Sequence, residues 1–204
     1  LPVTDKNGRE VYSELGEMLF THFGVSGPLV LSASANMQSF PPATYKLKIN
    51  LKPALTEEEL DRRLISDLGE NSAKDFINSL GKLLPQKLIE TVVYRTGVDP
   101  HKKSANVTRE ERQSLLEVLR GFEIGVKGFR PIEEAIITSG GVDVSEINPK
   151  TMELKNHPGI FVAGELIDID AYTGGYNLQL AFSTGHLAGK SAAEAWRALV
   201  PTLT

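Results

Sequence analysis

Two short segments near the C-terminus combine residue types that suit a ligand site. Residues 159–164 form a continuous apolar run, typical of a strand buried on both faces, and Glu165 follows at its carboxyl end. In open α/β sheets, ligands bind at this edge. Gly174 and Gly175 then open a helix predicted to reach about Leu199, and bare backbone at a helix start lets N–H groups approach a ligand closely. The combination predicts a site for a polar, partly anionic ligand.

Each of these features has a plainer interpretation when it stands alone. The diglycine could be a tight turn with a helix cap, and Glu165 could be a solvated loop carboxylate. The helix carries small residues at spacings of four, three and four, which predict a face that lies tightly on a sheet (Ala181, Gly185, Ala188 and Ala192). Strand end, acid, diglycine and helix together favour a ligand site, but they do not name the ligand.

Composition excludes several other kinds of chemistry. The 204 residues include no Cys, which excludes disulfides, thiolate nucleophiles and Cys-ligated metals, and the four His residues are too scattered to predict a metal site. The net charge of −4 argues weakly against a nucleic-acid surface. No apolar run approaches the roughly 20 residues of a membrane span, and no signal peptide opens the chain. We therefore expect a cytoplasmic protein and, because Leu1 replaces an initial Met, a piece of a longer one.

The elements that must position the site fall into zones of different character. Residues 1–50 mix strand and helix, 51–120 are helical, 121–145 return to strands, and 146–204 hold the apolar run and the long helix. Strands are expected at residues 17–23, 45–51, 122–126 and 134–138. A short helix is expected from Leu29 to about Asn36, because Pro28 suits the first helical position.

Capping signatures mark where the helices of the second zone begin. In a capping box, a Ser or Thr and an acid three residues later each bond the other's backbone. This pattern predicts three helix starts (Thr56 with Glu59, Ser72 with Asp75, and Thr108 with Glu111), and Gly121 is expected to end the last helix. We interpret this zone as a small helical subdomain inserted between strands.

Four segments resemble, in order, the signatures of the HI0933-like flavoproteins (YhiN and BaiN type), which are NAD(P)/FAD-dependent oxidoreductases. They are Gly16–Pro28 (GEMLFTHFGVSGP), Thr138–Val142 (TSGGV), Thr151–Glu153 (TME) and Gly164–Gln179, which contains Gly-Glu and Gly-Gly-Tyr-Asn. The matches bracket nearly the whole chain. Leu154 replaces a frequent Ser and Ala171 a usual Gly, and the chain contains no G-x-G-x-x-G loop for the pyrophosphate.

The resemblance implies an α/β (α+β) fold that holds the C-terminal part of a two-dinucleotide-binding-type FAD domain and a β-rich second domain. On this basis residues 1–50 and 121–145 belong to the second domain, 51–120 are its helical insertion, and 146–204 return to the FAD domain. The implied FAD-binding residues are Thr138, Gly140, Gly141, Gly164, Glu165, Asp168, Gly174, Gly175, Tyr176 and Asn177. Glu165 would contact the ribitol chain, and the backbone of 174–177 would face the pyrimidine side of the flavin ring.

The resemblance also implies NAD(P)H as the electron donor and an unsaturated substrate. A steroid enone and a uracil in RNA are both chemically admissible, so the substrate stays open between a small molecule and an RNA base. The expected partner is the N-terminal FAD-binding portion of the parent chain, without which the fragment is expected to be inactive. His22 is a candidate catalytic acid–base group or substrate contact, and a satisfied structural His is an equal alternative.

Other interpretations are weaker. Ser26 does not lie in a G-x-S-x-G nucleophile elbow, because Pro28 follows Gly27 directly, so a serine hydrolase is excluded. Residues 101–103 (His-Lys-Lys) are expected to be a solvated loop rather than an anion site. The competing class is a non-catalytic partner-binding module, in which residues 51–130 bind a macromolecule and the flavin motif is vestigial.

Overall fold

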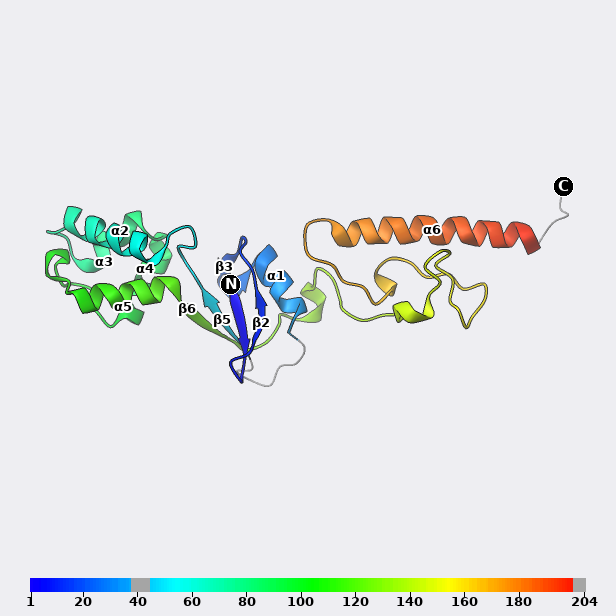
Figure 1. Ribbon diagram of the computed structural model, residues 1–204, viewed down its shortest axis with the longest axis horizontal. Helices are drawn as coiled ribbons and strands as arrows, with labels where there is room; N and C mark the ends of the chain where they lie inside the picture. Colours follow the sequence, from blue (N-terminus) through cyan, green and yellow to red (C-terminus); the bar gives the residue numbers. More distant parts are fainter. Residues whose placement is uncertain (38–44, 200–204) are drawn as a thin grey trace. The chain divides into compact units, whose positions relative to one another are not determined.

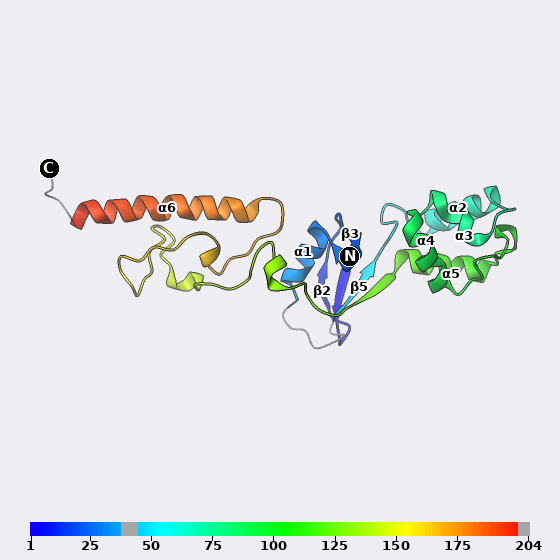
Figure 2. The same ribbon diagram turned by 180° about the vertical axis from the view of Figure 1, so that it is seen from behind.

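Residues 1–37 and 45–199 are described by a computed structural model, shown from two sides in Figures 1 and 2. The chain divides into two units. The first comprises residues 1–15 and the described part of 40–127, and the second comprises residues 16–37 and 128–199. Both contain helices and paired strands, so the expected mixed α/β fold class is confirmed. The domain boundaries expected from the sequence stay a prediction.

The sheet of the first unit has four antiparallel strands in the order β2-β1-β5-β6. They are β1 (Pro2–Asp5), β2 (Glu10–Ser13), β5 (Tyr45–Ile49) and β6 (Phe122–Val126). In β5, Tyr45, Leu47 and Ile49 are buried while Lys46 and Lys48 are exposed, because successive side chains point to opposite faces of a strand. The expected strands at 45–51 and 122–126 are thus confirmed, with β5 ending at Ile49.

Four α-helices connect β5 to β6 within this unit: α2 (Glu57–Glu70), α3 (Phe76–Ser79), α4 (Gln86–Thr96) and α5 (Arg109–Arg120). Two short 3-10 helices, η1 (Leu80–Lys82) and η2 (Ser104–Asn106), lie between them. Their apolar faces supply most of the buried side chains of the unit, including Leu60, Leu64, Val92, Leu115 and Leu119. In Figure 1 these helices form the cyan and green cluster that follows β5.

Two of the three expected capping boxes are present. Thr56 accepts from the Glu59 N–H at 3.2 Å and Glu59 accepts from the Thr56 N–H at 2.9 Å; Thr108 and Glu111 repeat the exchange. The third prediction is wrong. The helix α3 begins only at Phe76, so Asp75 takes the N-cap position instead of Ser72, and its carboxylate accepts from Lys103 rather than capping the helix.

The second unit contains a hairpin, two α-helices and three 3-10 helices. They are β3 (Leu19–Thr21), β4 (Gly24–Ser26), α1 (Pro28–Ala35), η3 (Ile132–Glu134), η4 (Val144–Glu146), η5 (Gly164–Leu166) and α6 (Tyr176–Leu199). α1 begins at Pro28 as expected, and α6 has the expected extent. The predicted strand at 17–23 is shortened to β3, since residues 22–23 form the hairpin turn.

Two further expected strands of this unit are not formed. Residues 132–138 contain η3 and irregular backbone, and residues 159–163 contain only an isolated bridge between Glu153 and Phe161. Residues 152–154 lie alongside the second segment, since Leu154 N–H donates to the Ile160 carbonyl at 2.9 Å and Val162 N–H donates to the Met152 carbonyl at 3.0 Å, but this single bridge is too short to form a strand. The described residues bring no strand alongside residues 134–138. Val162 is nevertheless buried with Ile147, Met152, Ile167 and Ala188 in the small core beneath α6.

Candidate functional site

Two loops that the sequence singled out, at residues 138–142 and 164–168, lie side by side in the second unit. Val142 N–H donates to the Leu166 carbonyl at 2.8 Å, and Asp168 N–H donates to the Val142 carbonyl at 2.9 Å. Gly141 lies so close to this segment that an added Cβ would approach the Leu166 oxygen to 2.5 Å, at a backbone φ of +147°. Only glycine fits here, which gives Gly141 a steric role.

A hydrogen-bonded pair joins the same two loops further on. Glu165 Oε1 accepts from both Thr138 N–H, at 2.8 Å, and Thr138 Oγ1, at 3.2 Å. Both residues were predicted to bind the cofactor, and the structure brings them together across 27 positions of sequence. Among the described residues, no group donates to Glu165 Oε2, so that oxygen can accept from a ligand hydroxyl.

The second loop is tied to α6 by a residue that the sequence analysis missed. Thr184 Oγ1 accepts from the Gly164 N–H at 2.9 Å and donates to the Leu180 carbonyl at 2.7 Å. Gly164 adopts a left-handed φ of +65°, and an added Cβ would lie 3.8 Å from Ala181. The one sequence signal was the position of Thr184 between Ala181 and Ala188, at helical spacing beside the predicted small-residue face. Thr184 therefore fixes the start of η5 against α6, and with it the position of Glu165.

The diglycine opens α6 through an unobstructed turn of a conformation that glycine adopts without strain. Gly174 and Gly175 have φ values of +125° and +94°, and nothing lies within 4 Å of a Cβ added at Gly175. The Asn177 side chain closes the loop, because Oδ1 accepts from Ala171 N–H at 2.7 Å and Nδ2 donates to the Ala171 carbonyl at 2.9 Å. Asn177 and Tyr176 can therefore offer a ligand their backbone N–H groups, which a helix start leaves without intrahelical partners.

Two of the four signature segments meet in this unit although they are distant in sequence. Thr173 Oγ1, beside the diglycine, donates to the Pro28 carbonyl at the start of α1 over 3.4 Å. His22 lies in the exposed turn of the β3–β4 hairpin and contacts Phe23 edge-on, with ring centroids 5.0 Å apart. The Arg130 guanidinium stacks 4.6 Å above the same Phe23 ring. The structure gives His22 no acidic partner among the described residues, and its catalytic role stays a prediction.

The structure corrects the expected small-residue face of α6. Ala188 is buried and Ala181 and Ala192 are half-buried, whereas Gly185 is exposed. The expected face therefore points inward at three of its four residues, and Gly185 is the exception because it lies at the edge of the inward face that Thr184, Ala188 and Ser191 share. The glycine has no contact within the unit that would require it.

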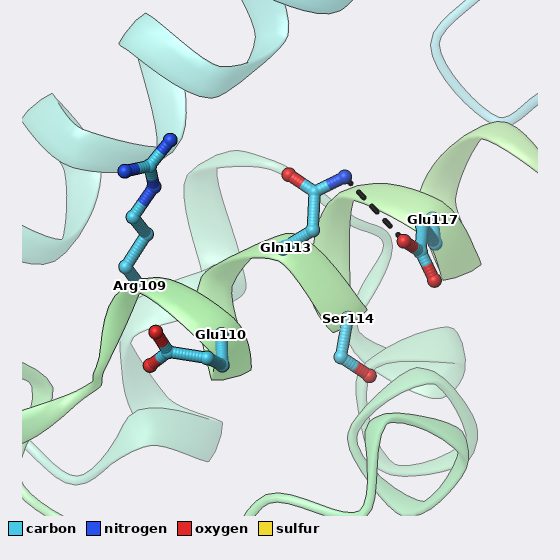
Figure 3. Close-up of a pocket in the computed structure, with 5 residues that line it drawn as sticks. All are labelled: Arg109, Glu110, Gln113, Ser114 and Glu117. Atoms are coloured by element: carbon cyan, nitrogen blue, oxygen red, sulfur yellow. Dashed lines mark hydrogen bonds between the residues drawn. The ribbon is translucent and has the colours of Figure 1, made fainter.

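A hollow among the described residues lies far from these loops in sequence, on the exposed side of α5 (Figure 3). It measures about 460 Å³ and is lined by Arg109, Glu110, Gln113, Ser114 and Glu117. Figure 3 shows these side chains spread along one helix, with Gln113 Nε2 donating to Glu117 over 3.4 Å. Mixed charges along a single helix without an enclosing wall are typical of a solvated face, so we place no site there.

The basic loop at residues 101–103 is likewise neutralised by neighbouring acids. Lys102 Nζ lies 2.7 Å from Glu111, and Lys103 Nζ lies 2.7 Å from Asp75. The hydrogen bond from Lys102, together with that from the Thr108 N–H, lowers the pKa of the Glu111 carboxyl. In residues 1–37 and 45–199 no cluster of His, Asp or Glu could hold a metal ion, and no helix is long and apolar enough to span a membrane.

Comparison with known proteins places these features in a family. A family profile described as "HI0933-like protein barrel and H2TH domain" matches residues 1–137. The chain is 33% identical over 194 residues to a ribosomal RNA dihydrouridine synthase from Haemophilus influenzae, covering 94% of this chain and 45% of that protein. It is 32% identical over 182 residues to the protein of the same name from Escherichia coli, covering 89% and 43%. A 3-dehydro-bile acid delta(4,6)-reductase from Clostridium scindens is 26% identical over 190 residues, covering 92% and 46%.

The fold and the loops define a mixed α/β segment with a glycine-rich turn at the start of a long helix. The chain belongs to the HI0933-like family of flavoprotein oxidoreductases, which confirms the resemblance carried by the four sequence signatures. It spans less than half the length of the relatives it matches.

Proposed function

We propose that the full-length protein is an FAD-dependent oxidoreductase that transfers hydride from NAD(P)H to an activated carbon–carbon double bond. The observation that carries the proposal is the Thr138–Glu165 pair in the same unit as the open diglycine turn of α6. From the sequence alone, Glu165 could be a solvated loop carboxylate and the diglycine a tight turn with a helix cap. Their placement on loops locked to one another and to α6 supports a common ligand.

The residues present fit the flavin half of FAD. The bare backbone at Gly175 leaves room for a flat ring to approach, since a Cβ there would meet nothing within 4 Å. The start of α6 carries about half a positive charge, which stabilises negative charge on a reduced ring. Glu165 Oε2 can accept from a ribitol hydroxyl, with Thr138 holding the carboxylate in place. FAD, when bound, supplies the hydride chemistry, and the protein supplies orientation and electrostatics.

For the substrate we propose a uracil base in ribosomal RNA. Two relatives that share about a third of the sequence carry the name ribosomal RNA dihydrouridine synthase. The bile acid reductase, which is less similar, reduces a different molecule by the same kind of chemistry, since both names describe saturation of a double bond conjugated to a carbonyl. A steroid enone is therefore the outcome to test against RNA.

The first experiment measures bound flavin in the purified full-length protein by absorbance. Gly175→Leu should abolish flavin binding, because its side chain occupies the open approach to α6. Gly8→Leu is the matched control: Gly8 also has a positive φ, of +79°, and open space around it, but it lies in the β1–β2 turn of the first unit. Glu165→Gln should weaken FAD binding about 10- to 100-fold, the effect of removing a charged hydrogen-bond acceptor.

Several results would refute the proposal. If the full-length protein is colourless and takes up no FAD, the non-catalytic module becomes the better interpretation. If Gly175→Leu and Gly8→Leu retain equal flavin, the diglycine does not face the cofactor. The purified protein is also given a steroid enone and, separately, unmodified ribosomal RNA from a deletion strain. If it reduces the enone but forms no dihydrouridine in the RNA, the proposed substrate is wrong while the flavin chemistry stands.

A further inference from the structure

α6 has three distinct faces, and the described residues of its own unit pack against one of them. The inward face includes Ala181, Thr184, Ala188 and Ser191, which are buried or half-buried. A second face, at the usual 100° per residue, is polar and exposed and consists of Gln179, Ser183, His186, Lys190, Glu194 and Arg197. The third face lies between them on the helical wheel.

This third face is apolar and exposed along most of the helix. Leu178, Phe182, Gly185, Gly189 and Trp196 lie within about 40° of one line, at spacings of four, three, four and seven. We call these five residues the apolar stripe. Leu178, Phe182 and Trp196 are 63%, 69% and 66% exposed. From Leu178 to Trp196 the stripe is about 27 Å long and contains no charged residue. A solvated helix face normally carries charge, so this one is built to be covered.

Exposed large hydrophobic side chains are concentrated in the second unit. Among the described residues, the exposed large hydrophobic side chains of the first unit are only Leu15, Ile65 and Tyr94, whereas all the others lie in the second unit. An irregular or broken backbone does not explain the exposed apolar side chains of α6, because the helix is continuous from Tyr176 to Leu199. The second unit therefore presents the apolar surface that a partner would bury.

The glycines indicate what kind of partner fits. Gly185 and Gly189 are four residues apart in the middle of the stripe, and neither has any neighbour within 4 Å of an added Cβ. Glycine inside a helix costs roughly 0.5–1 kcal/mol relative to alanine, and nothing in the unit offsets that cost. A flat notch between Phe182 and Trp196 offsets it when another helix packs across at close range.

We propose that the apolar stripe of α6 binds a helix from the part of the full-length polypeptide that lies outside residues 1–204. The relatives continue well beyond the matched region, which is 43–46% of their length. The inference rests on the proposed function, since that additional polypeptide is the portion expected to complete the FAD site. The contact sets the position of α6, and therefore of the diglycine at its start.

Site-specific thiol labelling tests the proposal, because this sequence contains no Cys. Leu178→Cys and Phe182→Cys report on the stripe, and Ser183→Cys and Lys190→Cys are matched controls on the polar face. Each variant is made in the full-length protein and in the 204-residue chain, and the labelling rate is read on the α6 peptide by mass spectrometry. We expect labelling at the stripe to slow at least about tenfold in the full-length protein, with the controls unchanged, because covered sites react only on opening.

The outcomes separate the contact from the flavin assignment. Equal labelling of both faces in the full-length protein overturns the inference. Protection that grows with protein concentration and accompanies a dimer mass also overturns it, because the occupant is then a second copy. Protection in a full-length protein that binds no FAD supports the contact and refutes only the proposed function. As a second substitution in the full-length Phe182→Cys protein, Gly185→Leu should restore labelling because its side chain blocks the close approach of the partner helix. Ser183→Leu, on the polar face, should not.

Discussion

Replacing Gly141 by alanine should destabilise the site loops far more than replacing its neighbour Gly140. Both glycines have a positive φ, of +147° and +108°, so both substitutions incur backbone strain of roughly 1–3 kcal/mol. Only at Gly141 would the new Cβ collide with backbone, 2.5 Å from the Leu166 oxygen; at Gly140 nothing lies within 4 Å. The collision separates the two loops.

The size of the difference follows from the bonds that the collision breaks. Val142 N–H to Leu166 and Asp168 N–H to Val142 each contribute about 1 kcal/mol net. Gly141→Ala should therefore cost about 2 kcal/mol more than Gly140→Ala, which is a factor of roughly 30 in local opening.

Residue-resolved amide hydrogen exchange of the 204-residue chain measures this opening directly. The Val142 and Asp168 amides should lose protection about 30-fold more in Gly141→Ala than in Gly140→Ala, while the amides of β5 serve as the internal reference. If the two variants differ by less than about twofold, the loops have room for a side chain and the steric argument is wrong.

Three further outcomes follow from other contacts. Thr108→Ala removes one half of the α5 capping box and should lower the free energy of unfolding by about 1 kcal/mol in urea titrations. The pKa of Glu111 is lowered by Lys102 and the Thr108 N–H, so its stabilisation is present above the ordinary carboxyl range and is lost as pH falls through its folded value. Glu111→Gln should flatten that acid-side loss in urea midpoints. Thr184→Val leaves the Gly164 N–H without an acceptor and should cost about 1–3 kcal/mol, read as faster exchange of that amide.

Elements specified by neighbouring residues could be predicted from the sequence. α1 begins at Pro28, and the Thr56 and Thr108 boxes start their helices, because each signal acts over three or four residues. Ser72 with Asp75 has the same spacing but fails, because α3 begins three residues later than the pattern predicts and the Asp75 carboxylate accepts from the distant Lys103. Local patterns thus predict correctly until a long-range partner competes for the same atoms.

The candidate site was predictable in residue type but not in its connections. The diglycine, Glu165 and Thr138 were all identified from the sequence, yet nothing in their spacing reveals that Glu165 bonds Thr138 across 27 positions. Thr184 was missed for the same reason, since its partner Gly164 is 20 residues away. Short motifs predict which residue types a site contains, whereas the contacts between motifs depend on the tertiary structure.

The failure of the predicted strand at residues 159–163 carries a last prediction. Its apolar pattern indicates burial on both faces, yet Ile160 is 51% exposed while Val162 is 4% exposed. If the polypeptide outside residues 1–204 supplies a strand beside the edge that residues 152–154 leave open, Ile160→Ser should change stability by less than about 0.5 kcal/mol in the 204-residue chain and by about 1.5–3 kcal/mol in the full-length protein. Val162→Ala, already buried, should cost about 1–3 kcal/mol in both. Urea unfolding of the two variants in both proteins decides the matter, because an equally small effect of Ile160→Ser in both proteins would mean that the apolar run gains no further strand.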